Sequence, residues 1–347
     1  MTVRLGINGF GRIGRAILRC VVDEPGRPVE IVAVNDLAPA ATLAHLLAYD
    51  STYGRLPVPV SVREGAITVN GRHIHVSNEL DPARLPWGLW EVDVVIESSG
   101  RFRGRSEAAV HLAAGARKVV VSSVVSALSD DIDATIVMGV NDDDYEPRVH
   151  DIVSAGSSTT NCVAPMLRVL HGSFGVRHAL LTALHGYTSD QSLLDGPHPD
   201  LRRARSAAVN LIPTGTAAAR AIGTVLPGLA GRVDGVAVRV PVEDGSLADL
   251  SAELAMPVTA GQVNRAFADA AHGAGKDVLR YTEAPIVSRD IIGDPASCVF
   301  DASLTRTEDT LVKVFGWYDN EWGYAHRALD LVELVGSTPA VIGKESP

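Results

Sequence analysis

The sequence has little basic charge and no long apolar run. Its 347 residues hold 31 lysines and arginines against 41 aspartates and glutamates, so the formal net charge is -10. A protein that binds nucleic acid normally presents a basic face, which this balance does not favour. No apolar stretch approaches the roughly 20 residues that a membrane-spanning helix needs. We therefore expect neither a nucleic-acid partner nor a membrane partner.

Cysteine is also scarce. The three cysteines, Cys20, Cys162 and Cys298, are scattered and show none of the close spacings of a metal site. The start of the chain runs into a strand-like segment and not into a secretory signal. Few, scattered thiols of this kind fit a reducing compartment. We expect buried free thiols, no metal centre and a cytoplasmic location.

The overall composition is that of a globular protein. Hydrophobic residues make up 46% of the chain and charged residues 21%, which are ordinary values. The length is enough for two domains, each with an adequate core.

A glycine-rich motif near the start of the chain indicates a dinucleotide site. An apolar strand candidate leads into Gly9-Phe10-Gly11-Arg12-Ile13-Gly14, a helix pattern follows, and a second strand ends at Asp36. These elements in this order are far more specific than the glycine spacing alone. In such a loop Gly9 permits a tight turn, Gly11 lets the backbone approach a pyrophosphate, and Gly14 allows close packing of helix on strand. The helix N-terminus offers N–H groups and a positive dipole to the phosphates.

Asp36 is the residue expected to choose the cofactor. Its carboxylate would accept hydrogen bonds from the adenosine ribose and would repel a 2′-phosphate, so NAD is favoured over NADP. The alternative is that Asp36 only ends a strand in a turn. Ser99 and Gly100, at the end of a later strand candidate, are either further cofactor neighbours or a helix cap.

The first half of the chain alternates strands and helices, which implies a parallel sheet covered on both faces. After Asp36 the patterns predict a helix, a hairpin series, a strand, a helix and a strand, at 41–47, 60–76, 93–97, about 106–114 and 118–122. The predicted fold class is therefore α/β, with a Rossmann-type domain first.

The second half opens with a polar segment that begins a helix. A strand at 152–154 leads to Ser157–Asn161, and an apolar helix pattern covers 163–170. Ser158 and Thr159 would then lie at the helix N-terminus, where the dipole can lower the pKa of a thiol or hold an oxyanion. The alternative is an ordinary Ser/Thr N-cap. Cys162, one turn further along, is expected to point into the packed protein.

One histidine and a set of hydroxyls and cations are the remaining candidate site residues. His185 is a candidate base and acid, because an imidazole with an ordinary pKa of about 6.5 suits proton transfer near neutrality. Arg239 is flanked by apolar strand residues, and a buried charge there needs a partner. Together with Thr188, Thr216 and Arg203 it would suit two phosphate sites.

The last third of the chain indicates a mixed or antiparallel sheet. Closely spaced strand candidates occur at 235–242, 247–254, 298–304 and 311–317. Helix patterns occur at 260–271 and, at the end of the chain, at 324–334. The second domain is therefore expected to be α+β.

Several segments, in sequence, order and spacing, resemble the phosphorylating glyceraldehyde-3-phosphate dehydrogenases. They are Gly6–Arg15, Asn35–Leu37, Thr159–Cys162, His185–Gln191, Asp200–Arg205 and Trp317–Tyr324. The resemblance covers nearly the whole chain. It implies an NAD-binding domain at 1–157, a catalytic domain at 158–322, and a C-terminal helix with a frayed tail at 323–347 that returns to the first domain. It also implies a homotetramer that acts on a small phosphorylated aldehyde and inorganic phosphate.

The motifs and the resemblance together assign roles to individual residues. Ser158 stands at the position of the nucleophile and His185 at that of the base. The positions expected to bind NAD are Gly9, Phe10, Gly11, Arg12, Ile13, Asp36, Ser99, Gly100, Ser122, Asn320 and Tyr324. Those expected to bind the substrate or phosphate are Ser157, Thr159, Thr188, Arg203, Thr216, Ala217 and Arg239.

The chain departs from the family pattern around this site. Serine stands at position 158, where the family has its nucleophilic cysteine, and Ala155-Gly156, Thr214–Ala217 and Ser122–Val125 also differ. These departures fit a diverged paralogue with an unusual substrate, and Ser158 alone equally fits an engineered replacement.

The replacement of a thiol by an alcohol has a chemical consequence. An alcohol is a far weaker acid than a thiol and needs a base during attack. The oxygen ester that it forms is also a poorer acyl donor than a thioester. We therefore expect NAD-dependent oxidation of an aldehyde to an acyl phosphate, severely impaired by Ser158. The alternative is a catalytically silent protein that binds NAD and sugar phosphate in a regulatory or assembly role.

Overall fold

The structure, a computed structural model, describes residues 2–122 and 132–337. The chain divides into two compact units. The first comprises Met1–Ile136, Asp143–Gly156 and Ala325–Pro347, and the second comprises Val137–Asp142 and Ser157–Tyr324. Ser123, one of the departures from the family pattern, lies outside the described residues. So do residues 338–347 of the tail that is expected to fray.

The first unit is built on a nine-stranded sheet in the order β10-β11-β9-β8-β1-β2-β7-β6-β5. All neighbours from β10 to β7 are parallel, and β7, β6 and β5 are antiparallel. The central strands β1, β8 and β9 are almost wholly buried, as parallel strands covered on both faces are. This is the parallel-rich, Rossmann-type sheet that the alternating pattern predicts. Its strands are β1 (Val3–Asn8), β2 (Val29–Asn35), β5 (Val60–Arg63), β6 (Ala66–Val69), β7 (Arg72–Ser77), β8 (Val94–Glu97), β9 (Lys118–Val121), β10 (Ala134–Thr135) and β11 (Ile152–Ser154), and a separate hairpin pairs β3 (Tyr49–Asp50) with β4 (Gly54–Arg55).

The helices of the first unit differ in one place from the sequence prediction. The single helix expected at about 106–114 is two short helices, because the N–H of Leu112 bonds the carbonyl of Ala109 only three residues back and tightens the turn there. The helices are α1 (Arg12–Asp23), α2 (Ala40–Ala48), α3 (Arg105–Ala108) and α4 (Val110–Ala113), with 3₁₀ turns η1 (Pro82–Arg84) and η2 (Asp142–Asp144).

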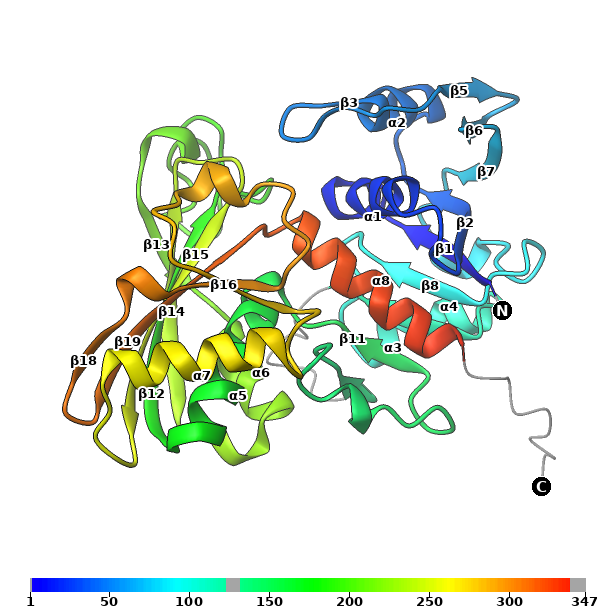
Figure 1. Ribbon diagram of the computed structural model, residues 1–347. Helices are drawn as coiled ribbons and strands as arrows, with labels where there is room; N and C mark the ends of the chain where they lie inside the picture. The colour runs from blue at the N-terminus through cyan, green and yellow to red at the C-terminus, as the bar shows by residue number, and fades with distance from the viewer. Residues whose placement is uncertain (1, 123–131, 338–347) are drawn as a thin grey trace. The chain divides into compact units, whose positions relative to one another are not determined.

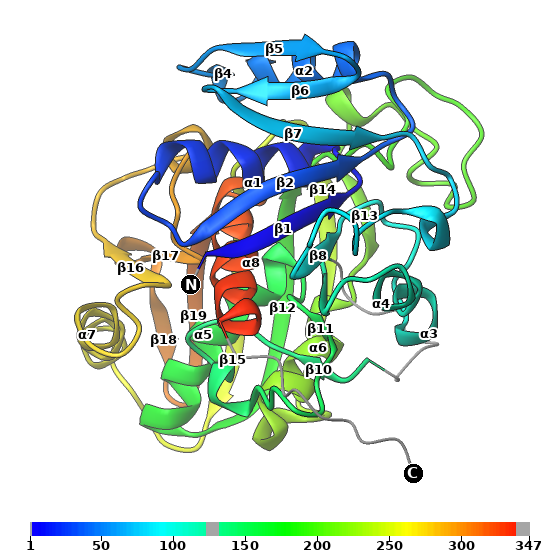
Figure 2. The same cartoon turned by 90° about the vertical axis from the view of Figure 1, so that its right-hand side faces the viewer.

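The final helix, α8 (Trp322–Gly336), begins two residues earlier than the sequence pattern indicates. The Asp319 carboxylate accepts the N–H groups of Glu321 and Trp322 at 2.9 and 2.6 Å and so satisfies donors at the start of the helix. From Ala325 onward α8 belongs to the first unit. There Arg27 pairs with Asp330 and Glu333 at 2.9 and 2.7 Å, and both views show α8 beside α1 and β1 (Figures 1 and 2).

The second unit is built on a mixed sheet in the order β13-β14-β12-β15-β19-β17-β16, with β18 paired to β19. The β12–β14 and β16–β17 pairs are parallel, and the other pairs are antiparallel. The mixed sheet expected for this half is therefore present. Its strands are β12 (Val176–Gly186), β13 (Ile212–Gly215), β14 (Val233–Val240), β15 (Ser246–Leu254), β16 (Leu279–Thr282), β17 (Cys298–Asp301), β18 (Arg306–Glu308) and β19 (Leu311–Tyr318).

Three helices pack on one face of this sheet, as Figure 1 shows. They are α5 (Ser158–Phe174), α6 (Ala218–Val225) and α7 (Ala260–His272), with 3₁₀ turns η3 (Ala207–Val209), η4 (Pro227–Leu229), η5 (Ser288–Ile291) and η6 (Ala302–Leu304). Side chains of α5 and α7, such as Leu167 and Phe267, share one buried cluster with sheet residues such as Leu250. Leu180 and Val236, in the sheet, are 66% and 51% exposed.

Other sequence expectations concern membrane spans, thiols and metals. No helix in the described part of the chain is long and apolar enough to cross a membrane. Cys20, Cys162 and Cys298 are buried free thiols, as expected. Within residues 2–122 and 132–337, no group of three or more His, Cys, Asp and Glu side chains could hold a metal ion.

Candidate active site

The glycine loop of the first unit has the geometry that its sequence predicts. Gly9 has a φ of +93°, and a Cβ there would lie 2.5 Å from the backbone nitrogen of Ser99. A Cβ on Gly14 would lie 2.5 Å from the carbonyl oxygen of Gly9. Gly11 precedes the first residue of α1 and has no atom within 4 Å of its Cβ position. The first and third glycines therefore serve the fold, and the second leaves open space at a helix N-terminus.

Asp36 connects the end of β2 to this loop. One carboxylate oxygen accepts the N–H of Phe10 at 2.9 Å, and the other accepts the N–H of Ala38 at 3.0 Å. Both readings of Asp36 are thus compatible with the structure, since it ends a strand in a turn and also lines a pocket.

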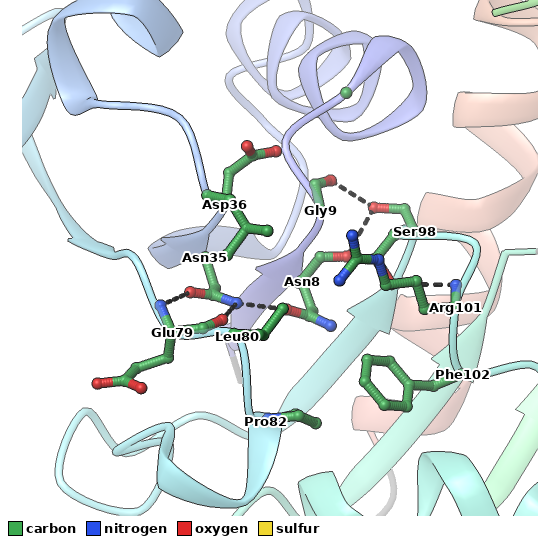
Figure 3. Close-up of a pocket in the computed structure, with 13 residues that line it drawn as sticks. Asn8, Gly9, Asn35, Asp36, Glu79, Leu80, Pro82, Ser98, Arg101 and Phe102 are labelled. Carbon is green, nitrogen blue, oxygen red and sulfur yellow. Dashed lines mark hydrogen bonds between the residues drawn. The ribbon is translucent and has the colours of Figure 1, made fainter.

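The pocket at this position has a volume of about 240 Å³. Figure 3 shows Asp36, Ser98 and Phe102 around it; Asp36 follows β2, and Ser98 and Phe102 lie in the segment after β8. Gly9, Gly11, Asp36 and Ser99 are the residues expected from the sequence that line it. Sequence reasoning missed the other lining residues, which are Asn8, Asn35, Leu37, Glu79, Leu80, Pro82, Ser98, Arg101 and Phe102.

A row of buried polar side chains lies beneath this pocket. Asn8 pairs in register with Asn35 and with Glu97 on the neighbouring parallel strands. Its amide donates to the Glu97 carboxylate at 2.5 Å and accepts from Asn35 at 2.7 Å. Trp87 donates to Nδ1 of His111, so the other ring nitrogen of His111 donates to Glu97 at 2.9 Å. The sequence signal that could have identified this row is that Asn8, Asn35 and Glu97 each end an apolar strand.

The other residues expected to bind the cofactor have these positions in the structure. Arg12 begins α1, and its side chain pairs with Asp50 at 2.5 Å. Ser122 donates to the carbonyl of Glu97 at 3.0 Å, and Gly100 has a φ of +72°. Phe10 is fully buried, and Ile13 lies in the first turn of α1.

In the second unit, Ser158 is the first residue of α5, at the positive end of its dipole. The N-cap is Ser157, whose hydroxyl accepts the N–H of Thr160 at 3.0 Å. The N-cap of α5 is therefore Ser157, and the Ser158 side chain does not cap the helix. Cys162 is fully buried, which raises its pKa, so it is not a substitute nucleophile, as expected.

His185 lies at the end of β12 and contacts Arg239 on β14. Nη1 of Arg239 is 2.7 Å from Nδ1 of His185 and 3.1 Å from the carbonyl oxygen of Gly186. Burial and the charge of Arg239 lower the pKa of His185 to about 4. The ring also packs edge-on against Tyr318, 6.1 Å away, and the Tyr318 hydroxyl contacts that of Thr159 at 2.9 Å. Among the described residues no hydrogen bond joins Ser158 to His185 directly.

Two of the expected anion-binding residues meet on a carboxylate. Thr188 and Arg203 both donate to Asp190. Arg203 also donates to the hydroxyl of Thr214, at 2.9 and 3.0 Å. Asp190 therefore occupies donors that an incoming phosphate would use. Sequence reasoning missed Asp190, although it lies inside the His185–Gln191 motif.

Unpaired donors lie beside this cluster. Nε of Arg239 and Nε2 of Gln191 are buried and have no hydrogen-bond partner among the described residues. A buried donor without a partner costs free energy, and a bound anion would relieve that cost. Thr216 and Ala217 lie at the start of α6, where the Thr216 hydroxyl accepts the N–H of Ala218 at 3.1 Å.

Asn320 is held by buried groups next to β15. Its side-chain oxygen accepts from the Ser246 hydroxyl at 2.6 Å, and its N–H donates to Asp244 at 3.2 Å. Asp244 is hydrogen bonded to the side chain of Asp319, and burial raises the pKa of Asp319. The acceptor end of the Asn320 amide is thus engaged. Tyr324, in the first turn of α8, is buried, which raises its pKa.

Comparisons with known proteins agree with this organisation. Residues 3–105 match the family model described as glyceraldehyde 3-phosphate dehydrogenase, NAD binding domain, and residues 157–320 match the model of its C-terminal domain. NAD is therefore the cofactor of the first unit.

Curated relatives are similar to the chain over almost its full length. Glyceraldehyde-3-phosphate dehydrogenase 1 of Streptomyces avermitilis is 53% identical over 97% of this chain and 100% of its own length. The Streptomyces coelicolor and Geobacillus stearothermophilus enzymes of that name are 54% and 51% identical, each over 97% of this chain and 99% of their own lengths. The chain belongs to the glyceraldehyde-3-phosphate dehydrogenase family.

Proposed function

We propose that this protein oxidises a short phosphorylated aldehyde, such as glyceraldehyde 3-phosphate, to an acyl phosphate. NAD serves as the oxidant and inorganic phosphate as the acyl acceptor. The observation that carries the proposal is the group of His185, Arg239, Thr188 and Arg203 in the unit whose helix α5 begins at Ser158. This group combines a titratable imidazole with two guanidinium groups, which suits acyl transfer to and from phosphorylated compounds.

In the proposed reaction Ser158 Oγ attacks the aldehyde carbon while His185 takes its proton. Bound NAD supplies the oxidising chemistry, which is acceptance of a hydride from that carbon. Phosphate oxygen then attacks the ester on Ser158, and His185 returns a proton to the serine oxygen. The α5 N-terminus faces the charge that develops at residue 158.

The serine makes this cycle slow. A thiol has a reference pKa of about 8.5 and is partly ionised near neutrality, whereas an alcohol depends on a base at the moment of attack. The oxygen ester also resists phosphate attack more than a thioester does. We therefore propose severe impairment relative to a cysteine form.

The residues proposed to hold NAD use backbone as much as side chains. Gly9, Gly11 and the first residues of α1 present the helix N-terminus to the pyrophosphate. Asp36 would exchange its N–H contacts for the ribose hydroxyls. In Asn320 the engaged oxygen leaves the amide nitrogen to donate to the nicotinamide carboxamide. The remaining proposed contacts are Phe10, Arg12, Ile13, Ser99, Gly100, Ser122 and Tyr324.

The second unit supplies the proposed phosphate contacts. Arg239 and Thr188 would hold the substrate phosphate, and the inorganic phosphate would contact Ser157, Thr159, Arg203, Thr216 and Ala217. Asp190 must release Thr188 and Arg203 when a phosphate enters, because its carboxylate holds both donors.

A second candidate is a catalytically silent NAD and sugar-phosphate binder. Ser158 favours it, because the remaining contacts for NAD and phosphate do not need a nucleophile. The unpaired buried donors of Arg239 and Gln191 serve either function.

A cytoplasmic location of the protein also stays a prediction.

We further propose that the protein is a homotetramer. The segment between β12 and β13 carries apolar side chains that are 68–82% exposed, namely Leu193, Leu194, Leu201, Val209 and Leu211. Exposed apolar groups in such number mark an interaction surface. Sedimentation analysis should give four chains, and Leu193→Asp with Leu194→Asp should lower the mass.

The decisive experiment for the reaction is a comparison of the parent with Ser158→Cys. The cysteine form should reduce NAD with glyceraldehyde 3-phosphate and inorganic phosphate, and the gain should require His185 and be lost on alkylation. Ser173→Cys, near the exposed far end of α5, is the matched control for an added thiol. A cysteine form that binds NAD but oxidises none of several short aldehyde phosphates would favour the silent binder.

A further inference from the structure

The contact between His185 and Arg239 fixes which nitrogen of the imidazole carries the proton. Arginine only donates hydrogen bonds, and its Nη1 lies 2.7 Å from Nδ1 of His185. Nδ1 must therefore present its lone pair, and the proton of the neutral ring is on Nε2. The Gly186 carbonyl lies 2.7 Å from the same Nδ1, but two acceptors cannot bond one another. Both instead accept from Nη1 of Arg239.

This arrangement keeps His185 from acting as a base. With its proton on Nε2, the ring has no lone pair on the side away from Arg239. Its lone pair on Nδ1 is already occupied. In this form His185 can donate a hydrogen bond to a reacting oxygen, but it cannot take the proton of Ser158.

The surroundings offer a second stable arrangement. If Nη1 of Arg239 turns away, Nδ1–H can donate to the Gly186 carbonyl, which is already at hydrogen-bond distance. The lone pair then moves to Nε2. A bound phosphate is the partner that can draw Arg239 away, because the Arg239 guanidinium is charged and partly buried, and its Nε is buried without a hydrogen-bond partner among the described residues. The tautomer change moves one proton between ring nitrogens through solvent and needs no other reactant.

We propose that the phosphate of the substrate switches on His185 by taking Arg239 away from Nδ1, so that the catalytic base forms only when a phosphorylated ligand is bound. This inference rests on the proposed function, since it takes Arg239 to be a phosphate ligand. It explains why a base and a phosphate-binding cation share one hydrogen bond. Substrate recognition and base activation become one event.

The charges around His185 favour this direction of change. Among the described residues, the charged and titratable side chains that face the ring are Arg239 on β14, Asp190 in the loop after β12 and Tyr318 on β19. Arg203 acts on Arg239 from the same loop as Asp190. When phosphate neutralises the two arginines, the cation beside the ring no longer opposes protonation. Burial, the larger cause of the low pKa of His185, remains, but the Arg239 charge no longer adds to it, so the pKa should rise from about 4.

The tautomer can be read directly from the nitrogen chemical shifts of the imidazole. Histidine-labelled protein should be studied by ¹H–¹⁵N correlation through two bonds, with His185→Gln used to assign the signals. The parent without anion should show His185 with its proton on Nε2. Saturation with glycerol 3-phosphate, which cannot be oxidised as an aldehyde, should move the proton to Nδ1 and raise the pKa by one unit or more.

Two variants separate the coupling from phosphate binding. Arg239→Met should give the Nδ1–H form with or without glycerol 3-phosphate. Arg202→Met removes an exposed arginine of the loop between β12 and β13 and should behave as the parent does. An Nδ1–H ring in the ligand-free parent, or no tautomer change in a protein that calorimetry shows to bind glycerol 3-phosphate, would overturn the inference alone. Absence of glycerol 3-phosphate binding would overturn both the inference and the proposed phosphate site.

Discussion

Gly9 and Gly11 lie two residues apart in one loop, and the structure predicts opposite consequences for replacing them by alanine. At Gly9 the φ of +93° lies in a region where an L-residue costs roughly 1–2 kcal/mol. The added Cβ would also lie 2.5 to 2.7 Å from backbone atoms of Ser98 and Ser99, which cannot move without separating the two loops. Overpacking of this kind costs about 1–3 kcal/mol. Gly9→Ala should therefore lower the free energy of unfolding by about 2–5 kcal/mol.

Gly11→Ala should leave the fold intact and damage cofactor binding. Its φ of -75° suits alanine and no atom lies within 4 Å of the added methyl group, so the expected loss of stability is only that of alanine at an N-cap, about 1 kcal/mol. The methyl group would enter the pocket at the helix N-terminus. NAD affinity should fall about tenfold or more, which corresponds to about 1.4 kcal/mol. Denaturant unfolding and calorimetric titration with NAD measure the two effects. A stable Gly9→Ala, or a Gly11→Ala that binds NAD normally, would refute this division of roles.

Three further predictions concern charged groups. NAD should bind more tightly than NADP, and Asp36→Ala should narrow that gap in calorimetric titrations, because the variant loses both the ribose acceptor and the repulsion of a 2′-phosphate; equal affinities in the parent would contradict the assignment. Arg239→Met should weaken glycerol 3-phosphate binding by about 1.5–3 kcal/mol while NAD binding is unchanged, and normal binding would exclude Arg239 as a phosphate ligand. The pKa of His185 is about 4 in the fold and about 6.5 when unfolded, so its contribution to stability is complete above pH 6.5 and is lost as the pH falls towards 4. This contribution to the free energy of unfolding is at most about 3 kcal/mol, and solvent screening of the partly exposed ring makes it smaller. His185→Gln should flatten this part of a stability–pH profile.

The sequence predicted the parts of the site that depend on neighbours along the chain. The glycine loop, Asp36 and the helix that begins near Ser158 are local features, and each is recognisable from the order of strand, turn and helix. The start of α5 at Ser158 rather than Val163 was less clear, because polar residues hide the first helical turn. Its cap, Ser157, could be identified only from geometry.

Contacts between distant segments were not predictable. Arg239 was recognised as a buried charge in need of a partner, but the partner, His185, lies 54 residues away on a parallel strand. Asp190 and Thr214 reach Arg203 through a loop whose path has no periodic pattern. Tyr318 was part of a family motif, yet its contacts to Thr159 and His185 depend on the sheet. Side-chain polarity indicates that a partner is needed, and only the fold determines which one.

The proposed tautomer of His185 affects a serine at position 158 more than it would affect a cysteine there. A thiol close to a helix N-terminus can ionise by itself, so a cysteine enzyme on this scaffold needs His185 mainly in the later proton transfers. An alcohol cannot ionise there, and its attack waits for a lone pair on Nε2 of His185. A serine form is consequently inactive whenever Arg239 holds Nδ1, whereas a cysteine form retains some reactivity. The advantage of cysteine over serine should therefore be greatest with aldehydes that carry no phosphate, because those substrates leave Arg239 on His185.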